Sequence, residues 1–374
     1  MKYYIIAGEA SGDLIASKLM QQIRLKDAQA AFRVWGGDLM QNAGGVLVKH
    51  YKDLAFMGFL EVFLNLRTIL RNLSFCKKDL LNHLPDVLIL VDYPGFNLRI
   101  AEFAKRHGIK VVYYISPQIW AWKKNRIKGI KKNVDKMLVI LPFESAFYAQ
   151  HNYSVDFVGH PLLDIIKETA SELNIQTFKN DNGLDKRPVI AFLPGSRKQE
   201  IKTMLPLMLH VCKAFPEFQC VVSGVSWQPE SLYQNIIGTN PVKIVYGQTY
   251  NLLLNSTAAL VTSGTATLET ALLGIPEVVC YKGSRISYEI AKRLIKNIKY
   301  ISLVNLVADQ EVVKELIQID CTPQKMTTEL QKILPEGERR ALILKDCEKL
   351  KTQLGDEGAS ERAAEIVVTT ANRK

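Results

Sequence analysis

Two acids follow apolar, strand-like runs in the first half of this 374-residue chain. Asp92 ends the run DVLILVD, and Glu9 follows the run KYYIIAG in the turn GEASGD. A carboxylate at the carboxyl end of a buried strand can take a proton from a substrate hydroxyl, as a general base does. Each acid could instead cap a helix or form a turn. For Asp92 we favour the base, because ligands of doubly wound sheets bind at this edge.

The turn GEASGD, residues 8–13, stands where a nucleotide-binding fold would place its phosphate cradle. It is neither G-x-G-x-x-G nor a P-loop, and a phosphate cradle would not carry two acids. Gly8 and Gly12 permit tight backbone geometry, and Ser11 or Asp13 could cap the helix that follows. The turn therefore raises the question of which group other than a phosphate it holds.

A turn in the second half, FLPGSRKQEI at residues 192–201, carries groups suited to an anion. Gly195 and Ser196 offer backbone N–H groups, and Arg197 offers a two-pronged donor for phosphate. An ordinary turn with a surface arginine is the alternative. The place of this turn directly after an apolar run favours the anion site.

A second anion signal lies in VTSGTATLETALLGIP, residues 261–276. A strand-like run ends there in the turn Ser263, Gly264, Thr265, and a helical pattern begins. A helix N-terminus offers free N–H groups and the positive end of the helix dipole. Glu269 lies one turn inside and could reach a ribose diol, as acids in nucleotide folds do. A capped helix with a solvated glutamate is the alternative.

These turns interrupt two series of apolar runs that alternate with helical patterns. The first series is KYYIIAG, FRVWGG, DVLILVD, KVVYYIS, KMLVIL and VDFVGH, and the second is PVIAFLPG, QCVVSGV, VKIVYG, AALVTSG, PEVVCYKG and ISLVNLV. Such runs are typical of buried parallel strands, and helices between them indicate βαβ units. We therefore predict an α/β protein with two doubly wound, Rossmann-like domains facing across a cleft. They comprise residues 1–168 and 187–349, and a C-terminal helix of about 350–374 packs back on the first.

Composition restricts the partner and the compartment. The net charge of +11 favours an anionic partner, whether nucleic acid, acidic lipid or phosphorylated substrate. The six cysteines are scattered without a C-x-x-C pair, which predicts reduced thiols and no metal site. The first strand-like run begins at Lys2, so we expect no signal peptide and a cytoplasmic location. The sequence also lacks the run of about 18 apolar residues that a membrane-spanning helix needs.

Two further stretches admit two interpretations each. Residues 116–136, SPQIWAWKKNRIKGIKKNVDK, carry a lysine-rich helical face that is either solvated or a nucleic-acid footprint. Residues 54–73, LAFMGFLEVFLNLRTILRNL, carry a wide apolar face that is either core or an interfacial helix at a membrane. In the second interpretation, aromatic and basic side chains lie on the membrane side: Phe56, Phe59, Phe63, Arg67 and Arg71.

Taken in order, the motifs of the chain resemble those of the lipid-A-disaccharide synthases. They are GEASGD, GFLEV, DYPGFN, SPQIWAW, GHPLLD, LPGSRKQEI, SGTATLET and GASERAA, and they extend over essentially the whole chain. The resemblance implies a glycosyltransferase of the GT-B fold, peripheral to the inner face of a bacterial inner membrane. It implies transfer of diacylglucosamine from UDP to diacylglucosamine 1-phosphate, which gives the β(1→6)-linked core of lipid A and releases UDP.

The resemblance also implies roles for particular residues. It makes Asp92 the base and Arg197 a contact of the UDP phosphate. It places the turn from Ser263 to Thr265 at the pyrophosphate, and it places Glu269 and Asn305 at the nucleotide. The nucleotide then belongs to the second half of the chain.

The first half, by the same resemblance, holds the acceptor sugar. Hydroxyl groups of a sugar suit carboxylate acceptors, which gives Glu9 and its neighbour Ser11 a place in that site. The chain departs from the family pattern at three positions. Val304 stands where proline is usual, Glu277 where an apolar residue is usual, and Gly95 where an aspartate is frequent.

Two rival functions are weighed against this one. A UDP-sugar epimerase of the same double architecture would bind UDP but would need no acyl-chain surface such as residues 54–73. A nucleic-acid-binding module around Lys123 to Lys132 would explain the net charge, but it would give no role to Asp92 and Arg197 at the ends of their strands. We therefore expect lipid-linked sugar substrates and an anionic membrane surface as partners, and no nucleic acid. We expect no metal or other cofactor, since no carboxylate pair adjoins the phosphate turn, and either a monomer or a homodimer.

Overall fold

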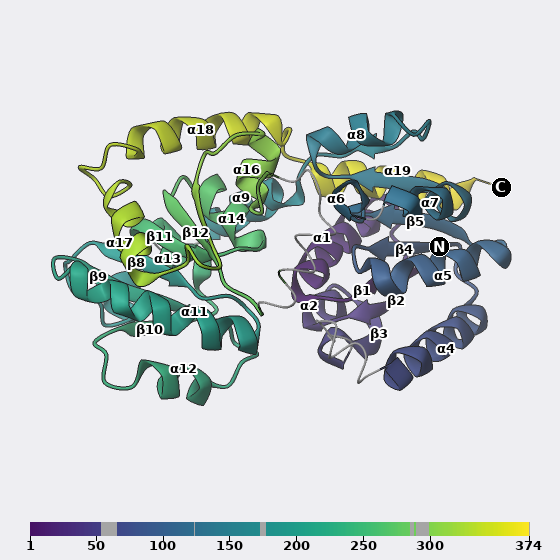
Figure 1. Ribbon diagram of the computed structural model, residues 1–374. Helices are drawn as coiled ribbons and strands as arrows, with labels where there is room; N and C mark the ends of the chain where they lie inside the picture. Colours follow the sequence, from purple (N-terminus) through teal and green to yellow (C-terminus); the bar gives the residue numbers. More distant parts are fainter. Residues whose placement is uncertain (54–65, 123, 173–176, 285–287, 289–298, 374) are drawn as a thin grey trace. The chain divides into compact units, whose positions relative to one another are not determined.

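The computed structural model describes residues 1–53, 66–122, 124–172, 177–284, 288 and 299–373 (Figure 1). These residues form two compact units. The first unit contains Met1–Asp164 and the chain from Leu354 onward, and the second unit lies between them in the sequence. Within the described residues no helix is both long and apolar enough to cross a bilayer.

The first unit is built on a parallel seven-stranded sheet of order β3-β2-β1-β4-β5-β6-β7. The strands are β1 (Lys2–Ala7), β2 (Ala31–Gly36), β3 (Gly45–His50), β4 (Val87–Val91), β5 (Lys110–Tyr114), β6 (Lys136–Val139) and β7 (Asp156–Phe157). The helices are α1 (Ala10–Lys26), α2 (Asp38–Asn42), α4 (Leu66–His83), α5 (Pro94–Arg106), α6 (Ile119–Trp122), α7 (Ile127–Asn133), α8 (Pro142–Ala149) and α19 (Ala359–Asn372). Helix α9 (Pro161–Glu172) begins at the end of this unit.

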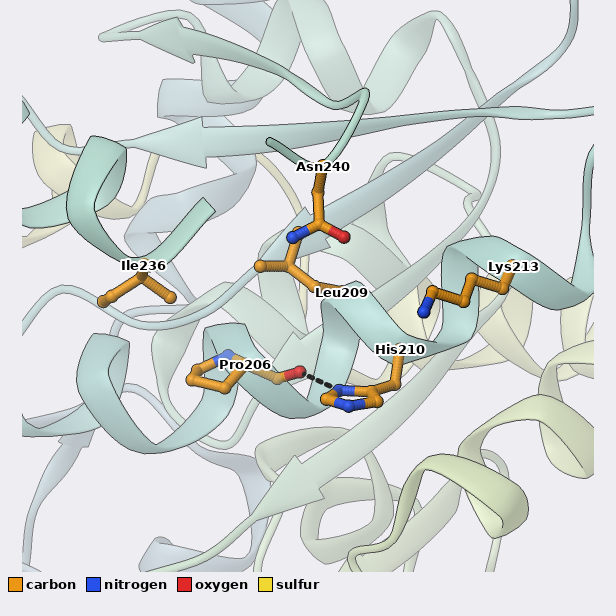
Figure 2. A pocket seen from close by; sticks show the side chains of 6 residues that line it. All are labelled: Pro206, Leu209, His210, Lys213, Ile236 and Asn240. Atoms are coloured by element: carbon orange, nitrogen blue, oxygen red, sulfur yellow. Dashed lines mark hydrogen bonds between the residues drawn. The ribbon is translucent and has the colours of Figure 1, made fainter. Parts of the chain in front are cut away.

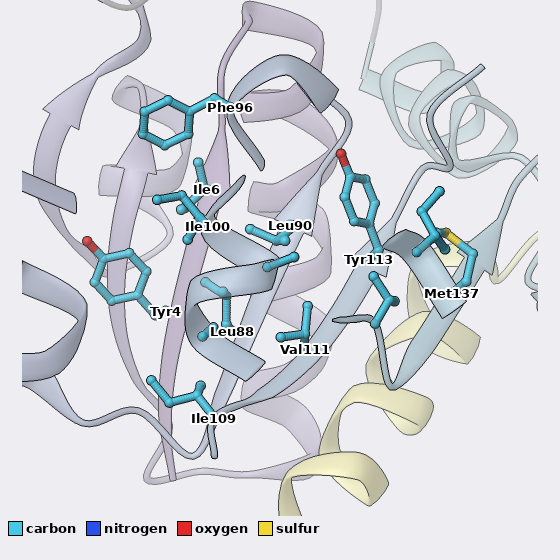
Figure 3. Packing of buried hydrophobic residues seen from close by; sticks show 14 of the residues in the cluster. Tyr4, Ile6, Leu88, Leu90, Phe96, Ile100, Ile109, Val111, Tyr113 and Met137 are labelled. Carbon is cyan, nitrogen blue, oxygen red and sulfur yellow. The ribbon is translucent and has the colours of Figure 1, made fainter. Parts of the chain in front are cut away.

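Burial on both faces explains why the central strands of this sheet are continuous apolar runs. Every residue of β4, VLILV, is fully buried between β1 and β5. One face of the sheet packs on α4, α5 and α7 through a cluster that includes Leu90, Ile100 and Tyr113 (Figure 3). The opposite face is covered by α1 and α19. A parallel sheet covered on both faces needs no polar side, so its strands do not alternate.

The helix α19 joins the first unit through polar contacts between two motifs far apart in the sequence. In GHPLLD, the Asp164 carboxylate accepts hydrogen bonds from the backbone N–H groups of Gly358 (2.6 Å) and Ser360 (3.0 Å) at the start of α19. In GASERAA, Arg362 Nε donates to the carbonyl of Val158 at 2.9 Å. These motifs therefore hold the C-terminal helix on the sheet.

The second unit repeats the design with a parallel six-stranded sheet of order β10-β9-β8-β11-β12-β13. Its strands are β8 (Val189–Leu193), β9 (Gln219–Gly224), β10 (Lys243–Tyr246), β11 (Ser256–Thr262), β12 (Glu277–Tyr281) and β13 (Lys314–Ile317). The helices are α10 (Phe178–Asp181), α11 (Lys198–Val211), α12 (Glu230–Ile237), α13 (Thr249–Leu254), α14 (Thr265–Leu272), α16 (Leu303–Ala308), α17 (Pro323–Gln331) and α18 (Arg340–Gln353). Two doubly wound parallel sheets confirm the predicted fold class.

One predicted strand of the second unit is wrong. The run ISLVNLV contains the helix α16, and the sixth strand is β13, which follows it. Ser302 begins this helix, because its hydroxyl accepts a hydrogen bond from the backbone N–H of Asn305 at 3.3 Å. A serine N-cap before a short apolar run starts a helix as readily as the run alone suggests a strand.

Candidate functional site

Glu9 and Asp92 lie at the same edge of the first sheet. Strands β1 and β4 are neighbours, with Ala7 paired to Val91, and each acid follows the last residues of its strand. Asp92 comes directly after β4, and Glu9 is the residue before α1. Parallel strands end at a common edge, so two acids that are far apart in the sequence become neighbours.

The surroundings at this edge of the sheet shift the pKa of the Asp92 carboxyl. The residue retains contact with solvent. Even so, loss of hydration and then the negative charge of Glu9 raise the pKa of the Asp92 carboxyl to about 7, against a lowering contribution from the backbone N–H of Tyr93. A carboxyl with a pKa near neutrality is suited to proton transfer, because it both gains and loses a proton at working pH.

The backbone of this turn is strained. Asp92 has a φ of 44°, and Tyr93 has φ 47° and ψ 54°, so two successive non-glycine residues occupy the left-handed region. The Tyr93 ring closes over the first turn of the chain, where a Cβ on Gly8 would lie 2.3 Å from the ring. The packing of the Tyr93 ring therefore requires a glycine at position 8. This contact brings the turn after β1 against the turn after β4.

The remaining residues of GEASGD do not have the capping roles considered from the sequence. The helix α1 begins at Ala10, and Asp13 lies inside its first turn. The buried Asp13 carboxylate instead accepts hydrogen bonds from the backbone N–H groups of Gly37 (2.7 Å), Met40 (3.1 Å) and Leu39 (3.2 Å) at the start of α2. Ser11 lies exposed on α1. Asp13 thus holds the β2–α2 turn beside the site.

In the second unit, the turn Gly195, Ser196, Arg197 connects β8 to α11, and Gly195 has a φ of 104° that favours glycine. A carboxylate from α11 already occupies this turn. Glu200 Oε2 accepts from the backbone N–H groups of Ser196 (3.1 Å) and Arg197 (3.2 Å), and Oε1 accepts from Arg197 Nη1 (2.9 Å). Sequence reasoning missed Glu200, although its i+3 spacing from the helix start is that of a capping box.

The turn Ser263, Gly264, Thr265 connects β11 to α14, as the sequence predicts. The residue before the helix is Gly264, which is exposed and has no side chain to cap the N-terminus. Ser263 is fixed by its backbone N–H, which donates to the carbonyl of Cys280 at 2.9 Å. The helix therefore presents its N-terminal end at an open turn, where an anion is stabilised by the dipole.

Glu269 is half-buried in α14. Burial raises the pKa of the Glu269 carboxyl to about 7, and a hydrogen bond with the hydroxyl of Tyr250 from α13 lowers it. Burial and the neighbouring Glu269 raise the pKa of Tyr250 in turn. Tyr250 is a second residue that sequence reasoning missed, because no motif contains it.

Asn305 has a structural role in this arrangement. The side chain is fully buried. Its Oδ1 accepts from the backbone N–H groups of Val312 (2.9 Å) and Val313 (3.0 Å), and its Nδ2 donates to the Val313 carbonyl (2.8 Å) and to Glu315 (3.0 Å). These bonds use the donors and acceptors of the amide. They connect α16 to β13, and the nucleotide contact expected of Asn305 stays a prediction.

The stretch proposed to face a membrane is described only in part. Phe56, Phe59 and Phe63 lie outside the described residues. Arg67 and Arg71 are exposed on α4, next to two apolar side chains, Leu66 and Leu70, that are 45% and 53% exposed. Helix α4 thus presents a mixed apolar and basic surface.

Other features of the described residues lie apart from these turns. A pocket of about 230 Å³ on the second unit is lined by Pro206, Leu209, His210, Lys213, Ile236 and Asn240, none of them a predicted site residue (Figure 2). Within the described ranges, no group of three or more histidine, cysteine, aspartate or glutamate residues could hold a metal ion. Glu277 is fully buried in β12, and neither of its carboxyl oxygens has a hydrogen-bond partner there.

The two sheets define the fold of the protein, which is the GT-B type found in glycosyltransferases and in UDP-sugar epimerases. The fold is similar to that of UDP-GlcNAc 2-epimerase from Neisseria meningitidis bound to UDP-GlcNAc, with a TM-score of 0.69 and 13% identity over 99% of this chain and 100% of that one. It is similar to the glycotransferase of kitacinnamycin, with a TM-score of 0.65 and 12% identity over 99% of both chains.

Sequence comparison then identifies the family. The profile of lipid-A-disaccharide synthetase matches residues 3–370. The chain is 41% identical over 372 residues to the lipid-A-disaccharide synthase of Syntrophus aciditrophicus (98% of this chain, 96% of that one). It is 36% identical over 373 residues to that of Coxiella burnetii strain CbuK_Q154 (97% and 96%). The chain therefore belongs to the lipid-A-disaccharide synthetase family, and it is a glycosyltransferase of lipid A disaccharide synthesis.

Proposed function

We propose that this protein joins UDP-2,3-diacylglucosamine to 2,3-diacylglucosamine 1-phosphate in a single inverting displacement. Asp92 takes the proton of the acceptor 6-hydroxyl as that oxygen attacks C1 of the donor sugar. The observation that carries this proposal is the Asp92–Glu9 edge of the first sheet, where loss of hydration and a neighbouring acid raise the pKa of the exposed Asp92 carboxyl to about 7. Glu9 also offers an acceptor for the hydroxyls of the incoming sugar.

The leaving group is UDP, whose phosphate gains negative charge as the bond to the sugar breaks. We assign its stabilisation to the exposed guanidinium of Arg197 and to the N-terminus of α14 at Gly264. Fixed cations and dipoles at the developing charge lower the barrier without reorganising in the reaction. We assign Glu269, which is hydrogen-bonded to Tyr250, to the ribose hydroxyls. In this proposal no step uses a metal ion.

The acyl chains of both substrates require access to a membrane. The support for this is α4, where exposed Leu66 and Leu70 lie beside Arg67 and Arg71, together with the net charge of +11. Apolar side chains insert at the interface, and each Lys or Arg near an anionic surface contributes about 1 kcal/mol. We therefore propose peripheral binding of the first unit to the inner face of the inner membrane.

The test is product analysis with purified protein, the UDP-linked donor and the phosphorylated acceptor lipid. We expect a disaccharide 1-phosphate on thin-layer chromatography and an equal amount of UDP, undiminished by a chelator of divalent metals. Asp92→Asn should lower the rate of transfer by about 10²- to 10⁴-fold but leave UDP binding in calorimetry nearly unchanged. Isomerisation of the donor without an acceptor would favour an epimerase instead. A gel shift with nucleic acid but no binding to anionic vesicles would contradict the membrane part of the proposal.

A further inference from the structure

The left-handed turn at Asp92 needs an explanation of its own. A non-glycine residue with positive φ is unfavourable, and Asp92 and Tyr93 are two in succession. Such a conformation persists only where the surroundings fix it more strongly than the backbone resists. The groups that bond to the Asp92 backbone are therefore the ones that set where its side chain stands.

Two fully buried side chains bond to one atom, the carbonyl oxygen of Asp92. Asn97 Nδ2, from α5, donates to it at 2.8 Å. The hydroxyl of Tyr113, from β5, donates to it at 2.6 Å. The Asn97 amide also donates to the Val91 carbonyl at 3.2 Å, and the backbone N–H of Asp92 donates to the Tyr114 carbonyl at 3.1 Å.

These donors come from rigid surroundings. The Tyr113 ring is packed in the core of the first unit, beside Leu90 and Met137 (Figure 3). Asn97 lies in the first turns of α5, four residues after the left-handed Tyr93, to whose carbonyl its own backbone N–H donates at 3.0 Å. The Asp92 carbonyl is thus held from two elements, while the residue itself stays exposed to solvent.

We propose that Asn97 and Tyr113 are positioning residues for the base. They fix the Asp92 backbone in the left-handed region, which holds its carboxylate beside Glu9 in place for the acceptor hydroxyl. The inference rests on the proposed function of Asp92 as the base. It differs from a purely structural role because the two side chains then affect the reaction only through Asp92.

The neighbouring tyrosine offers a matched control. Tyr113 and Tyr114 are both fully buried in β5 and, as successive strand residues, face opposite sides of the sheet. The hydroxyl of Tyr114 has Asp164 and Arg362 as its electrostatic neighbours, on the side of α19. Tyr113→Phe and Tyr114→Phe therefore make the same chemical change in the same strand, and only the first removes a bond to Asp92.

The first readout is the rate of transfer. We expect Tyr113→Phe to lower kcat by between about 5- and 100-fold, the range for losing one hydrogen bond or a small displacement of a reacting group. The KM for the donor and the affinity for UDP should stay unchanged, and Tyr114→Phe should keep the wild-type kcat. In an Asp92→Asn background, Tyr113→Phe should lower kcat no further, because the basic carboxylate that Tyr113 positions is gone.

The second readout does not depend on activity. The pKa of Asp92 is measured from its carboxyl ¹³C resonance, assigned by comparison with Asp92→Asn. We expect Tyr113→Phe to move this pKa from about 7 toward the usual range of an aspartate, since a released carboxylate gains water and leaves Glu9. Equal kcat and equal Asp92 pKa in Tyr113→Phe and wild type would overturn the inference, as would an equal loss of rate in the Asp92→Asn background. A wild-type protein without transferase activity would overturn the proposed function alone, and the pKa measurement would still decide the positioning role.

Discussion

The pH dependence of the reaction is the sharpest consequence of the Asp92–Glu9 edge. A general base works in its deprotonated form, so transfer should rise with pH through the pKa of Asp92. With a pKa of about 7, about one tenth of the enzyme is active at pH 6 and about nine tenths at pH 8. We therefore expect kcat at pH 8 to exceed kcat at pH 6 by about tenfold.

Replacing Glu9 tests the cause of this pKa. Loss of hydration is the largest cause of the raised pKa of Asp92, and the charge of Glu9 is the next. Glu9→Gln removes the charge at nearly constant size, so the pKa should fall by about one unit, as expected for one like charge in a partly hydrated site. At pH 6 about half of the variant would then be deprotonated, and its ratio of kcat at pH 8 to kcat at pH 6 should fall from about ten to about two.

The assay is the initial rate of UDP release between pH 5.5 and 9 at constant ionic strength, with both lipid substrates in mixed micelles. Each variant is normalised to its own plateau, because Glu9→Gln should also weaken acceptor binding. Glu102→Gln on α5 is the control, since it makes the same change of charge at an exposed residue of the same unit. A flat profile for the wild type, or a shift of the Glu9→Gln profile to higher pH, would refute the assignment of Asp92 as a base tuned by Glu9.

Three further changes test other parts of the structure. Arg197→Lys should reduce both kcat and UDP affinity, because lysine cannot keep a two-pronged phosphate contact; near-normal turnover would remove Arg197 from the site. The pair Leu66→Ser and Leu70→Ser should weaken binding to anionic vesicles in flotation and spare unfolding stability, and added salt should weaken the wild-type binding. Glu277→Leu should stabilise the protein, because burial raises the pKa of the Glu277 carboxyl well above its usual value. As pH rises, this carboxyl therefore ionises in the unfolded state before it does so in the folded state. The free energy of unfolding of the wild type then falls by up to about 1.4 kcal/mol per pH unit. Denaturant midpoints at pH 5.5 and 7.5 should show this slope in the wild type and less of it in the variant.

The sequence predicts the strands well where they are buried on both sides. The run DVLILVD has no polar alternation and gives the fully buried β4, and the acid at its end lies at the sheet edge, where parallel strands place ligands. The run ISLVNLV is also rich in apolar residues, but its second residue, Ser302, caps a helix. A short apolar run does not distinguish the two outcomes, since periodicity needs more residues than it contains.

The partners of the site acids could not be predicted in the same way. Asp13 accepts from the N–H groups of Gly37, Leu39 and Met40, which lie 24 to 27 positions away in the chain. Tyr113 donates to the carbonyl of Asp92, which lies 21 positions away. Such contacts depend on which strands become neighbours in the sheet, and the residues of a local motif do not specify that pairing. Glu200 differs, because its bonds lie within one helical turn. Its occupation of the Arg197 turn was readable from the spacing of a capping box.

A raised pKa does not by itself identify the base, because three carboxyls in the part of the chain that the structure describes have a pKa of about 7. Glu144 is 1% exposed, and its Oε2 accepts from the backbone N–H groups of Ile140 and Leu141, so a substrate hydroxyl has no path to it. Glu269 is engaged by the Tyr250 hydroxyl, which suits a binding contact. Asp92 combines solvent access with a backbone held in a strained conformation by two buried donors. A structural carboxyl can have a raised pKa through burial alone, whereas a base must be reachable and fixed in position, and Asp92 is both exposed and fixed.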